Sequence, residues 1–311
     1  MKKNIEFLEV FKEINVINQK LELDWLEYYG VEIWIKREDL LHPYISGNKF
    51  RKLKYNILEN LNSQGWVTFG GAYSNHILAV AYAGFLFQKP TIGIIRGEEL
   101  QHAWQQNPTL IKAAKFGMQF RFISRELYHN KETIPTFFPE LQKHHWIPEG
   151  GTNALAIKGC EEILSNNDSK FHVITCAVGT GGTIAGIINS AKNYQKIIGF
   201  PALKGAFLAE DIRKFATSEI SWNLFNDYHF GGYGKVTSDL IQWLNEFYEQ
   251  TKIPLDPLYT GKMMYGILDL VKQNYFEKGT KILCIHTGGL QGIEGMNQNL
   301  KNKNKTTITY A

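Results

Sequence analysis

The chain has 311 residues, of which 44% are hydrophobic and 21% are charged, a composition typical of a globular protein and unlike that of a disordered chain. The net charge of +4 comes from 34 basic and 30 acidic residues, without a basic block in the body of the chain, so we expect no nucleic-acid partner. We also expect a cytoplasmic protein with no membrane partner, disulfide or metal site, because no apolar run reaches membrane-spanning length, the N-terminus lacks a signal peptide and the three cysteines are widely spaced.

Short apolar strands alternate with amphipathic helices along the chain. The predicted strands cover residues 31–36, 66–69, 91–95, 119–123, 171–178, 196–200 and 281–286. The predicted helices cover residues 48–60, 74–87, 108–116, 134–143, 153–164, 184–188, 238–250 and 261–273. This alternation predicts an α/β fold with mostly parallel sheets and helices on both faces. We expect two domains: a smaller α/β domain, residues 47–160, is inserted into a larger one, residues 1–46 and 161–311.

A lysine-containing turn precedes the first long helix. The segment Ser46-Gly47-Asn48-Lys49 is followed closely by Arg51 and Lys52. Among neighbouring cations and partly withdrawn from water, Lys49 would have a lowered pKa, and its amine could attack an aldehyde. Most lysines of a basic helix are solvated, however, so this segment alone favours a surface role for Lys49.

A glycine turn follows the strand at 66–69. It reads Gly70-Gly71-Ala72-Tyr73-Ser74-Asn75-His76, and Ser74 is placed to cap the next helix. The N-terminus of that helix could bind a substrate carboxylate or a cofactor hydroxyl through Ser74 and Asn75. The structural alternative is that Ser74 only caps the helix and that His76 only packs.

The most regular apolar strand, 171–178, runs into the loop Gly179-Thr180-Gly181-Gly182-Thr183 and then into a helix. Glycine N–H groups, two threonine hydroxyls and the positive end of a helix suit a phosphate group. The loop lacks the Gly-Lys-Ser/Thr ending of a P-loop and the Gly-x-Gly-x-x-Gly spacing, which argues against a nucleotide. A plain glycine turn after a strand is the alternative.

Three later segments join glycines to polar side chains. They are Gly231-Gly232-Tyr233-Gly234, Tyr259-Thr260-Gly261-Lys262 and His286-Thr287-Gly288-Gly289. Each alone could be an ordinary turn, so their meaning depends on the order in which all the segments occur.

Together with the string Ile35-Lys36-Arg37-Glu38-Asp39-Leu40, these segments resemble the family of D-cysteine desulfhydrases and 1-aminocyclopropane-1-carboxylate deaminases. The resemblance runs in the right order from about Val31 to Gly289. Members of this family are pyridoxal-phosphate enzymes with the two-domain architecture of the tryptophan synthase β-subunit, fold type II. The resemblance therefore implies a lyase or deaminase with pyridoxal phosphate as cofactor, a small amino acid as substrate and a homodimeric assembly.

The resemblance also implies roles for individual residues. The implied catalytic residues are Lys49, Ser74, Tyr233 and Tyr259. The implied cofactor contacts are Lys49, Asn75, Gly179, Thr180, Gly181, Gly182, Thr183 and Thr287. The implied substrate contacts are Ser74, Asn75, His76 and Thr260. In this assignment Lys49 binds the cofactor covalently and later moves the substrate's α-proton, while the glycine loop holds the phosphate.

Two positions distinguish the two activities within the family. The deaminases carry Glu after the tyrosine of Tyr-x-Gly-Lys and Leu after the histidine of His-x-Gly-Gly, whereas this chain carries Thr260 and Thr287. A carboxylate near the pyridine nitrogen favours its protonated form and strengthens the electron sink, which a threonine does less well. The pattern resembles the desulfhydrases and favours conversion of D-cysteine to pyruvate, sulfide and ammonia. The alternative is 1-aminocyclopropane-1-carboxylate deamination to 2-oxobutyrate and ammonia.

Functions outside this pair stay open as rivals. A homologue could bind the cofactor without catalysis, although a decayed site should have lost some of its polar residues. A nucleotide-binding oxidoreductase is disfavoured because no acidic residue ends the strand at 196–200, where it would bind a ribose. Serine dehydratases and cysteine synthases share the fold but carry different residues around the lysine.

Overall fold

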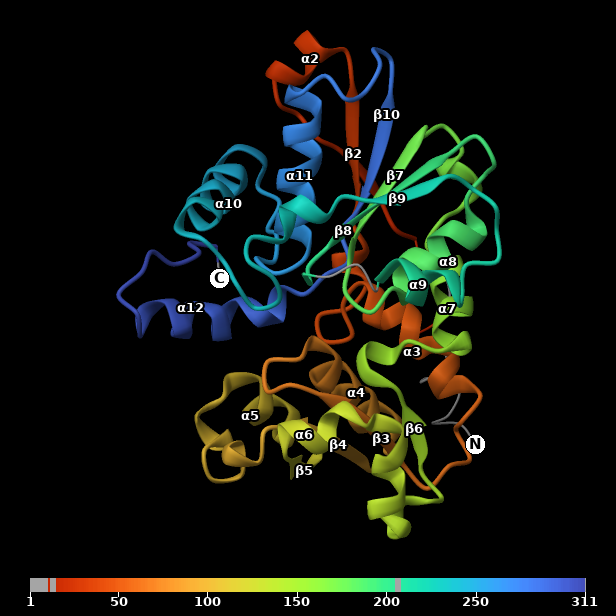
Figure 1. The fold of residues 1–311 in the computed structure, drawn as a ribbon, viewed down its shortest axis with the longest axis vertical. Helices are drawn as coiled ribbons and strands as arrows, with labels where there is room; N and C mark the ends of the chain where they lie inside the picture. Colours follow the sequence, from red (N-terminus) through yellow and green to blue (C-terminus); the bar gives the residue numbers. More distant parts are fainter. Residues whose placement is uncertain (1–10, 12–14, 205–207, 311) are drawn as a thin grey trace.

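The computed structural model describes residue 11 and residues 15–204 and 208–310, whose strands form two sheets. Figure 1 shows the two sheets one above the other, with helices around each. The first sheet has the order β1 (Asn18–Lys20), β2 (Glu32–Lys36), β10 (Lys281–Ile285), β7 (Val173–Val178), β8 (Lys196–Pro201) and β9 (Trp222–Leu224). All neighbouring strands in it are parallel except β1 and β2.

The second sheet is parallel throughout. Its order is β5 (Gln119–Ile123), β4 (Thr91–Arg96), β3 (Trp66–Gly70) and β6 (His145–Ile147). Every residue of the central strand β3 is buried, as is every residue of β7 in the first sheet. Burial on both faces is the expected state of parallel strands covered by helices. The prediction of two mostly parallel sheets is thus confirmed.

Helices cover both faces of each sheet. Their bounds are α2 Trp25–Tyr29, α3 Asn48–Leu58, α4 Asn75–Phe87, α5 Pro108–Lys115, α6 Arg125–His129, α7 Ala154–Glu161, α8 Gly182–Ser190, α9 Leu208–Arg213, α10 Ser238–Thr251, α11 Thr260–Lys272 and α12 Ile293–Lys301. One face of the first sheet packs on α10 and α11, and the other packs on α7, α8 and α9. Within the described part of the chain, no helix has the length and apolar character needed to span a bilayer.

Helices α3 and α7 join the two halves of the molecule. A Cβ on Gly159 of α7 would lie 2.0 Å from the carbonyl oxygen of Arg51 in α3, so the two helices are in backbone contact. On its other side α7 meets α8, where a Cβ on Gly186 would lie 2.4 Å from the Cβ of Cys160. Figure 1 shows α3, α7 and α8 between the two sheets. The division of the chain at 47 and 160 stays a prediction, because these helices pack continuously across it.

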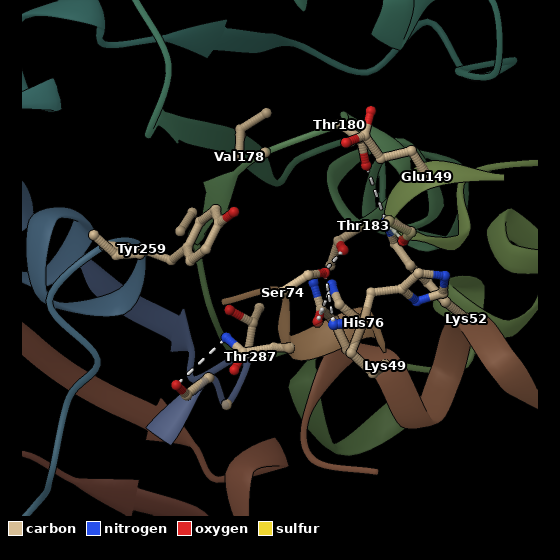
Figure 2. A pocket seen from close by; sticks show the side chains of 18 of the residues that line it. Lys49, Lys52, Ser74, His76, Glu149, Val178, Thr180, Thr183, Tyr259 and Thr287 are labelled. Carbon is tan, nitrogen blue, oxygen red and sulfur yellow. Dashed lines mark hydrogen bonds between the residues drawn. The ribbon is translucent and has the colours of Figure 1, made fainter. Parts of the chain in front are cut away.

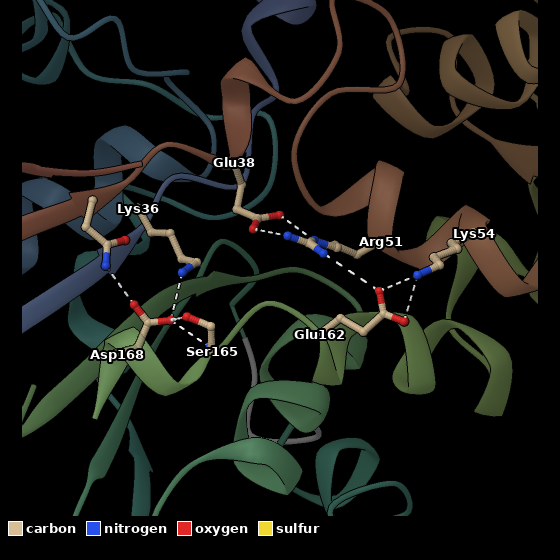
Figure 3. Close-up of polar contacts among 8 residues, drawn as sticks. Lys36, Glu38, Arg51, Lys54, Glu162, Ser165 and Asp168 are labelled. Carbon is tan, nitrogen blue, oxygen red and sulfur yellow. Dashed lines mark hydrogen bonds and ion pairs between the residues drawn. The ribbon is translucent and has the colours of Figure 1, made fainter. Parts of the chain in front are cut away.

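Buried ion pairs lie around the end of β2, and one of them joins the turn after β2 to α3 (Figure 3). Lys36, the last residue of β2, pairs with Asp168 at 2.7 Å. Two residues later, Glu38 accepts two hydrogen bonds from Arg51, at 2.8 and 2.7 Å. Arg51 lies two residues after Lys49 on α3, so this bidentate pair restrains the start of that helix. The charged residues 36–39 are therefore buried and paired rather than solvated.

One predicted helix is wrong. Residues 134–143 form two short 3-10 helices, Lys131–Phe137 and Pro139–Leu141, followed by β6. Pro135 and Pro139 supply no N–H to an α-helical ladder, and the chain turns at each. The short strands β1, β6 and β9 escaped prediction because three residues carry no readable alternation.

Candidate active site

Loops from both sheets meet at one cavity. They follow the carboxyl ends of β3, β7 and β10, which is where ligands bind in parallel α/β sheets. The cavity opens to solvent, and the empty space in it and in its mouth, open solvent included, is about 1350 Å³. Figure 2 shows the labelled side chains gathered around it.

The first turn of α3 brings Lys49 to the cavity wall. Gly47 precedes the helix with a φ of +58°, and a Cβ on it would lie 2.0 Å from the carbonyl oxygen of Thr287. Only glycine fits this position without moving backbone. The N–H of Asn48 donates to the same carbonyl at 3.2 Å. The helix therefore begins directly against the loop after β10, and Lys49 projects from that junction.

The electrostatic surroundings of Lys49 disfavour its charged form. Burial, and after it the positive charge of Lys52, lowers the pKa of Lys49 to about 7. Its Nζ donates to the amide oxygen of Asn48 at 3.2 Å, and the Asn48 amide donates in turn to the hydroxyl of Thr183 at 2.9 Å. An amine in this state is neutral in a large fraction of molecules near pH 7, and a neutral amine is the nucleophilic form.

Hydrogen-bond donors gather at the start of α8, in the loop that follows β7. Gly181 has a φ of +81°, and no side chain caps the first turn of α8. The amino group of Lys52 donates to the hydroxyls of Thr152 and Thr180 at 3.0 and 3.3 Å. A Cβ on Gly182 would lie 3.1 Å from that amino group, so glycine keeps the space open. Helix N–H groups, hydroxyls and one cation make up a site suited to a phosphate.

Ser74 and Asn75 lie where the sequence predicted them, at the N-terminus of α4 and on the cavity wall. The hydroxyl oxygen of Ser74 accepts the N–H groups of His76 and Ile77, at 3.2 and 3.4 Å, so the predicted cap is confirmed. Its own proton stays available to a ligand. The amide of Asn75 donates to the carbonyl oxygen of Gly289 at 3.4 Å and thereby touches the loop after β10.

His76 is buried behind Ser74 and also borders the cavity. Its Nε2 lies 2.8 Å from the hydroxyl of Thr68. Burial, followed by the charges of Lys49 and Lys52, holds the pKa of His76 well below its usual range. The imidazole is therefore neutral at physiological pH, which suits a packing and hydrogen-bonding role better than that of an acid.

Tyr233 and Tyr259 lie next to each other on the cavity wall, with ring centroids 6.2 Å apart and ring planes tilted by 60°. Tyr233 is 46% exposed, whereas Tyr259 lies deeper beside Gly179. Burial, and the neighbouring Tyr233, raise the pKa of Tyr259 well above its usual value. Tyr259 therefore keeps its proton throughout the physiological range, so it does not act as a base there, although its neutral hydroxyl can donate or accept a hydrogen bond.

Two of the predicted site residues do not reach the cavity wall. Gly182 lies behind its neighbours in the glycine loop, and Thr260 is fully buried in the first turn of α11. The hydroxyl and N–H of Thr260 both donate to the carboxylate of Asp256, at 2.8 and 2.7 Å. Asp256 also accepts the N–H groups of Leu258 and Tyr259, so its carboxylate holds the start of α11 and keeps Thr260 turned from the cavity. Thr287, by contrast, lies on the wall at the end of β10.

Three charged residues of the wall were missed from the sequence: Lys52, Arg96 and Glu149. Lys52 could have been found, because it follows Lys49 by one helical turn and must share its face. Arg96 ends β4, and the carboxyl end of a parallel strand is a position where functional side chains gather. Glu149 follows strand β6, and because this strand was not predicted, the sequence did not indicate that Glu149 lies at the end of a strand.

These groups fit a molecule that carries both a phosphate and an aldehyde. The phosphate would occupy the donor site of Lys52 and the start of α8, while the neutral amine of Lys49 meets the aldehyde. Among the described residues on the wall, Glu149 is the single carboxylate, and its charge is matched by Lys131 at 3.0 Å. An anionic ligand therefore meets no uncompensated negative charge.

Comparisons with known proteins agree with this reading of the site. Residues 18–288 match the family described as pyridoxal-phosphate dependent enzymes. A Pyrococcus horikoshii protein, named provisionally as a 1-aminocyclopropane-1-carboxylate deaminase, is 31% identical over 85% of this chain and 86% of its own. The Arabidopsis thaliana bifunctional D-cysteine desulfhydrase/1-aminocyclopropane-1-carboxylate deaminase, a mitochondrial protein, is 30% identical over 85% of this chain and 74% of its own. The crystal structure of an ACC deaminase homologue superposes with a TM-score of 0.80 at 27% identity, over 97% of this chain and 99% of the other.

Proposed function

The chain belongs to the family of pyridoxal-phosphate dependent enzymes, with their type II α/β fold, and from this we propose that it removes the β-substituent and the amino group of a small amino acid. The favoured substrate is D-cysteine, which with water gives pyruvate, ammonia and hydrogen sulfide. The observation that carries the proposal is that the Lys49 amine, with a pKa of about 7, lies in the same cavity as the donor site formed by Lys52 and the start of α8.

Each part of the cavity has a task in this reaction. When bound, pyridoxal phosphate withdraws electrons from the substrate's α-carbon and so lets its proton leave. Lys49 would hold the cofactor through its Nζ, and the same Nζ would accept the substrate's α-proton. Lys52 and the loop from Gly179 to Thr183 hold the phosphate. Asn75 and Thr287 are the proposed partners of the ring.

The substrate's carboxylate is assigned to the N-terminus of α4. The hydroxyl of Ser74 and the N–H of Asn75 supply donors there, because Ser74 already accepts the N–H groups of His76 and Ile77, and the positive end of the helix favours an anion. Tyr233 and Tyr259 would close the opposite side of the substrate and exclude water from the reacting carbon. His76, neutral and buried, supports this wall.

The choice of D-cysteine over the cyclopropane acid rests on Thr287. It lies on the cavity wall where the deaminases carry leucine, whereas Thr260 is directed to Asp256 and adds no group to the wall. The names of the relatives support both activities, so 1-aminocyclopropane-1-carboxylate deamination is the second candidate. The homodimer and the cytoplasmic location also stay predictions.

One assay separates the two candidates. The purified protein, loaded with pyridoxal phosphate, is given D-cysteine or 1-aminocyclopropane-1-carboxylate at matched concentrations. We expect pyruvate and sulfide from D-cysteine at a rate at least tenfold above that of 2-oxobutyrate formation from the cyclopropane acid. Comparable rates, or a faster reaction of the cyclopropane acid, would contradict the choice.

A further inference from the structure

Arg96 brings an unassigned positive charge to the cavity. It is the last residue of β4, it is half-buried, and it lies on the cavity wall. A Cβ placed on Gly71 would lie 3.8 Å from its Nη2, so the guanidinium sits beside the loop that leads into α4. This places Arg96 beside the loop that leads to the proposed site of the substrate's carboxylate.

No acidic side chain in the described part of the protein neutralises the charge of Arg96. Within the described residues Arg96 forms no ion pair, and its guanidinium carbon lies 5.7 Å from the ring centroid of Tyr128. The nearest acid on the wall, Glu149, is already occupied: it accepts the hydroxyl of Tyr128 at 2.7 Å and pairs with Lys131 at 3.0 Å. A guanidinium on the cavity wall without a carboxylate partner in the protein can pair with an anionic ligand.

The other positive groups of the cavity already have partners in the proposed reaction. Lys52 faces the cofactor phosphate, Lys49 carries the aldehyde, and the N-terminus of α4 takes the substrate's α-carboxylate. An α-amino acid with a neutral side chain would leave Arg96 unpaired. A second anionic group on the substrate would complete the charge balance.

We propose that Arg96 binds an anionic group attached to the β-carbon of the amino-acid substrate. Such a group is a carboxylate, a sulfonate or a thiolate, and the last includes the sulfur of cysteine as it leaves with the bonding electron pair. The proposal rests on the proposed function, because it places an amino acid in the cavity. A guanidinium prefers carboxylates and similar anions through paired N–H donors, so it would select substrates by charge and not by size alone.

Aspartate and asparagine provide the test, because they have nearly the same shape and differ in charge. Each enantiomer is titrated into the pyridoxal-phosphate-loaded protein, and the dissociation constant is read from the change in the cofactor's visible absorbance. For the enantiomer that binds, we expect the wild-type protein to bind aspartate at least tenfold more tightly than asparagine. Arg96→Met should bring the ratio of the two constants close to one, and Arg96→Lys should give an intermediate ratio.

The matched control is Arg125→Met. Arg125 is an exposed arginine of the same half of the molecule, and its partner is Glu99. This variant should keep the wild-type ratio. A wild-type ratio near one would overturn the proposal. A ratio that Arg96→Met leaves unchanged would also overturn it. If both ligands weaken together in that variant, Arg96 binds the α-carboxylate instead. Failure of the proposed function looks different: the protein would then show no cofactor absorbance that responds to any amino acid.

Discussion

The amino group of Lys52 lies 3.3 Å from the hydroxyl of Thr180, and this contact ties helix α3 to the loop after β7. Lys49 is one helical turn earlier on the same helix. The distance between the reactive amine and the phosphate site is therefore set by a single turn of α-helix, a rigid spacer. A ligand held at both ends is positioned by this helix more than by any loop.

Removal of the Lys52 charge should weaken the phosphate site. We expect Lys52→Met to raise the dissociation constant for pyridoxal phosphate by roughly tenfold to a hundredfold, because a charge-assisted hydrogen bond contributes about 1.5–3 kcal/mol. Titration of the apoprotein, followed by visible absorbance, measures this change.

Two controls make the Lys52 experiment specific. Lys54→Met removes a neighbouring lysine that pairs with Glu162, and it should change cofactor affinity less than about threefold. Pyridoxal, which lacks the phosphate, should lose less affinity than pyridoxal phosphate; a smaller common loss is expected because the charge of Lys52 also lowers the pKa of Lys49. A loss that is the same for pyridoxal and for its phosphate would count against a phosphate contact.

The lowered pKa of Lys49 predicts a distinctive pH dependence. With a pKa of about 7, the amine is mostly protonated below that pH and mostly neutral above it. We compare the rate at which the apoprotein captures pyridoxal phosphate with the rate at which Nα-acetyl-lysine captures it under the same conditions. Because the cofactor titrates equally in both reactions, its titration cancels in the ratio of the two rates. This ratio should be constant below about pH 6.5 and fall about tenfold per pH unit above about pH 7.5, because the free amine continues to deprotonate towards its own pKa. A ratio that stays constant up to about pH 9 would show that Lys49 has an ordinary pKa.

The buried pair of Glu38 and Arg51 should matter for stability. Glu38→Ala leaves Arg51 with Glu162 as its remaining acid, at 3.8 Å, and we expect a loss of about 3 kcal/mol in the free energy of unfolding. The control is Glu59→Ala, which breaks an exposed pair with Lys158 and should cost less than about 1 kcal/mol. Urea unfolding at equilibrium compares the two variants. Equal losses would mean that the buried pair does not anchor α3.

The sequence predicted those parts of the site that depend on local rules. Ser74 has the chemistry of a helix cap, and Gly47 and Gly181 occupy turns with positive φ, so the positions of α4, α3 and α8 could be read from the chain. The alternation of apolar segments likewise predicted both sheets.

The remaining features depend on contacts that the sequence does not display. Arg96 reaches the cavity only because β4 lies beside β3 in the second sheet, and the sequence of one strand does not reveal which strands lie next to it. Thr260 turns away from the cavity because Asp256 accepts both of its donors. The failed helix at 134–143 shows the opposite case, in which Pro135 and Pro139 override an apolar pattern that otherwise suits a helix.

The attachment of pyridoxal phosphate to Lys49 is the centre of this account, and mass spectrometry tests it directly. The protein is incubated with the cofactor, reduced with borohydride and digested. We predict one modified peptide, with the added mass on Lys49, and a Lys49→Ala protein that shows neither the modification nor the visible absorbance. Stable modification of Lys52 or another lysine in the wild-type protein, or a Lys49→Ala variant that keeps both signals, would contradict the account.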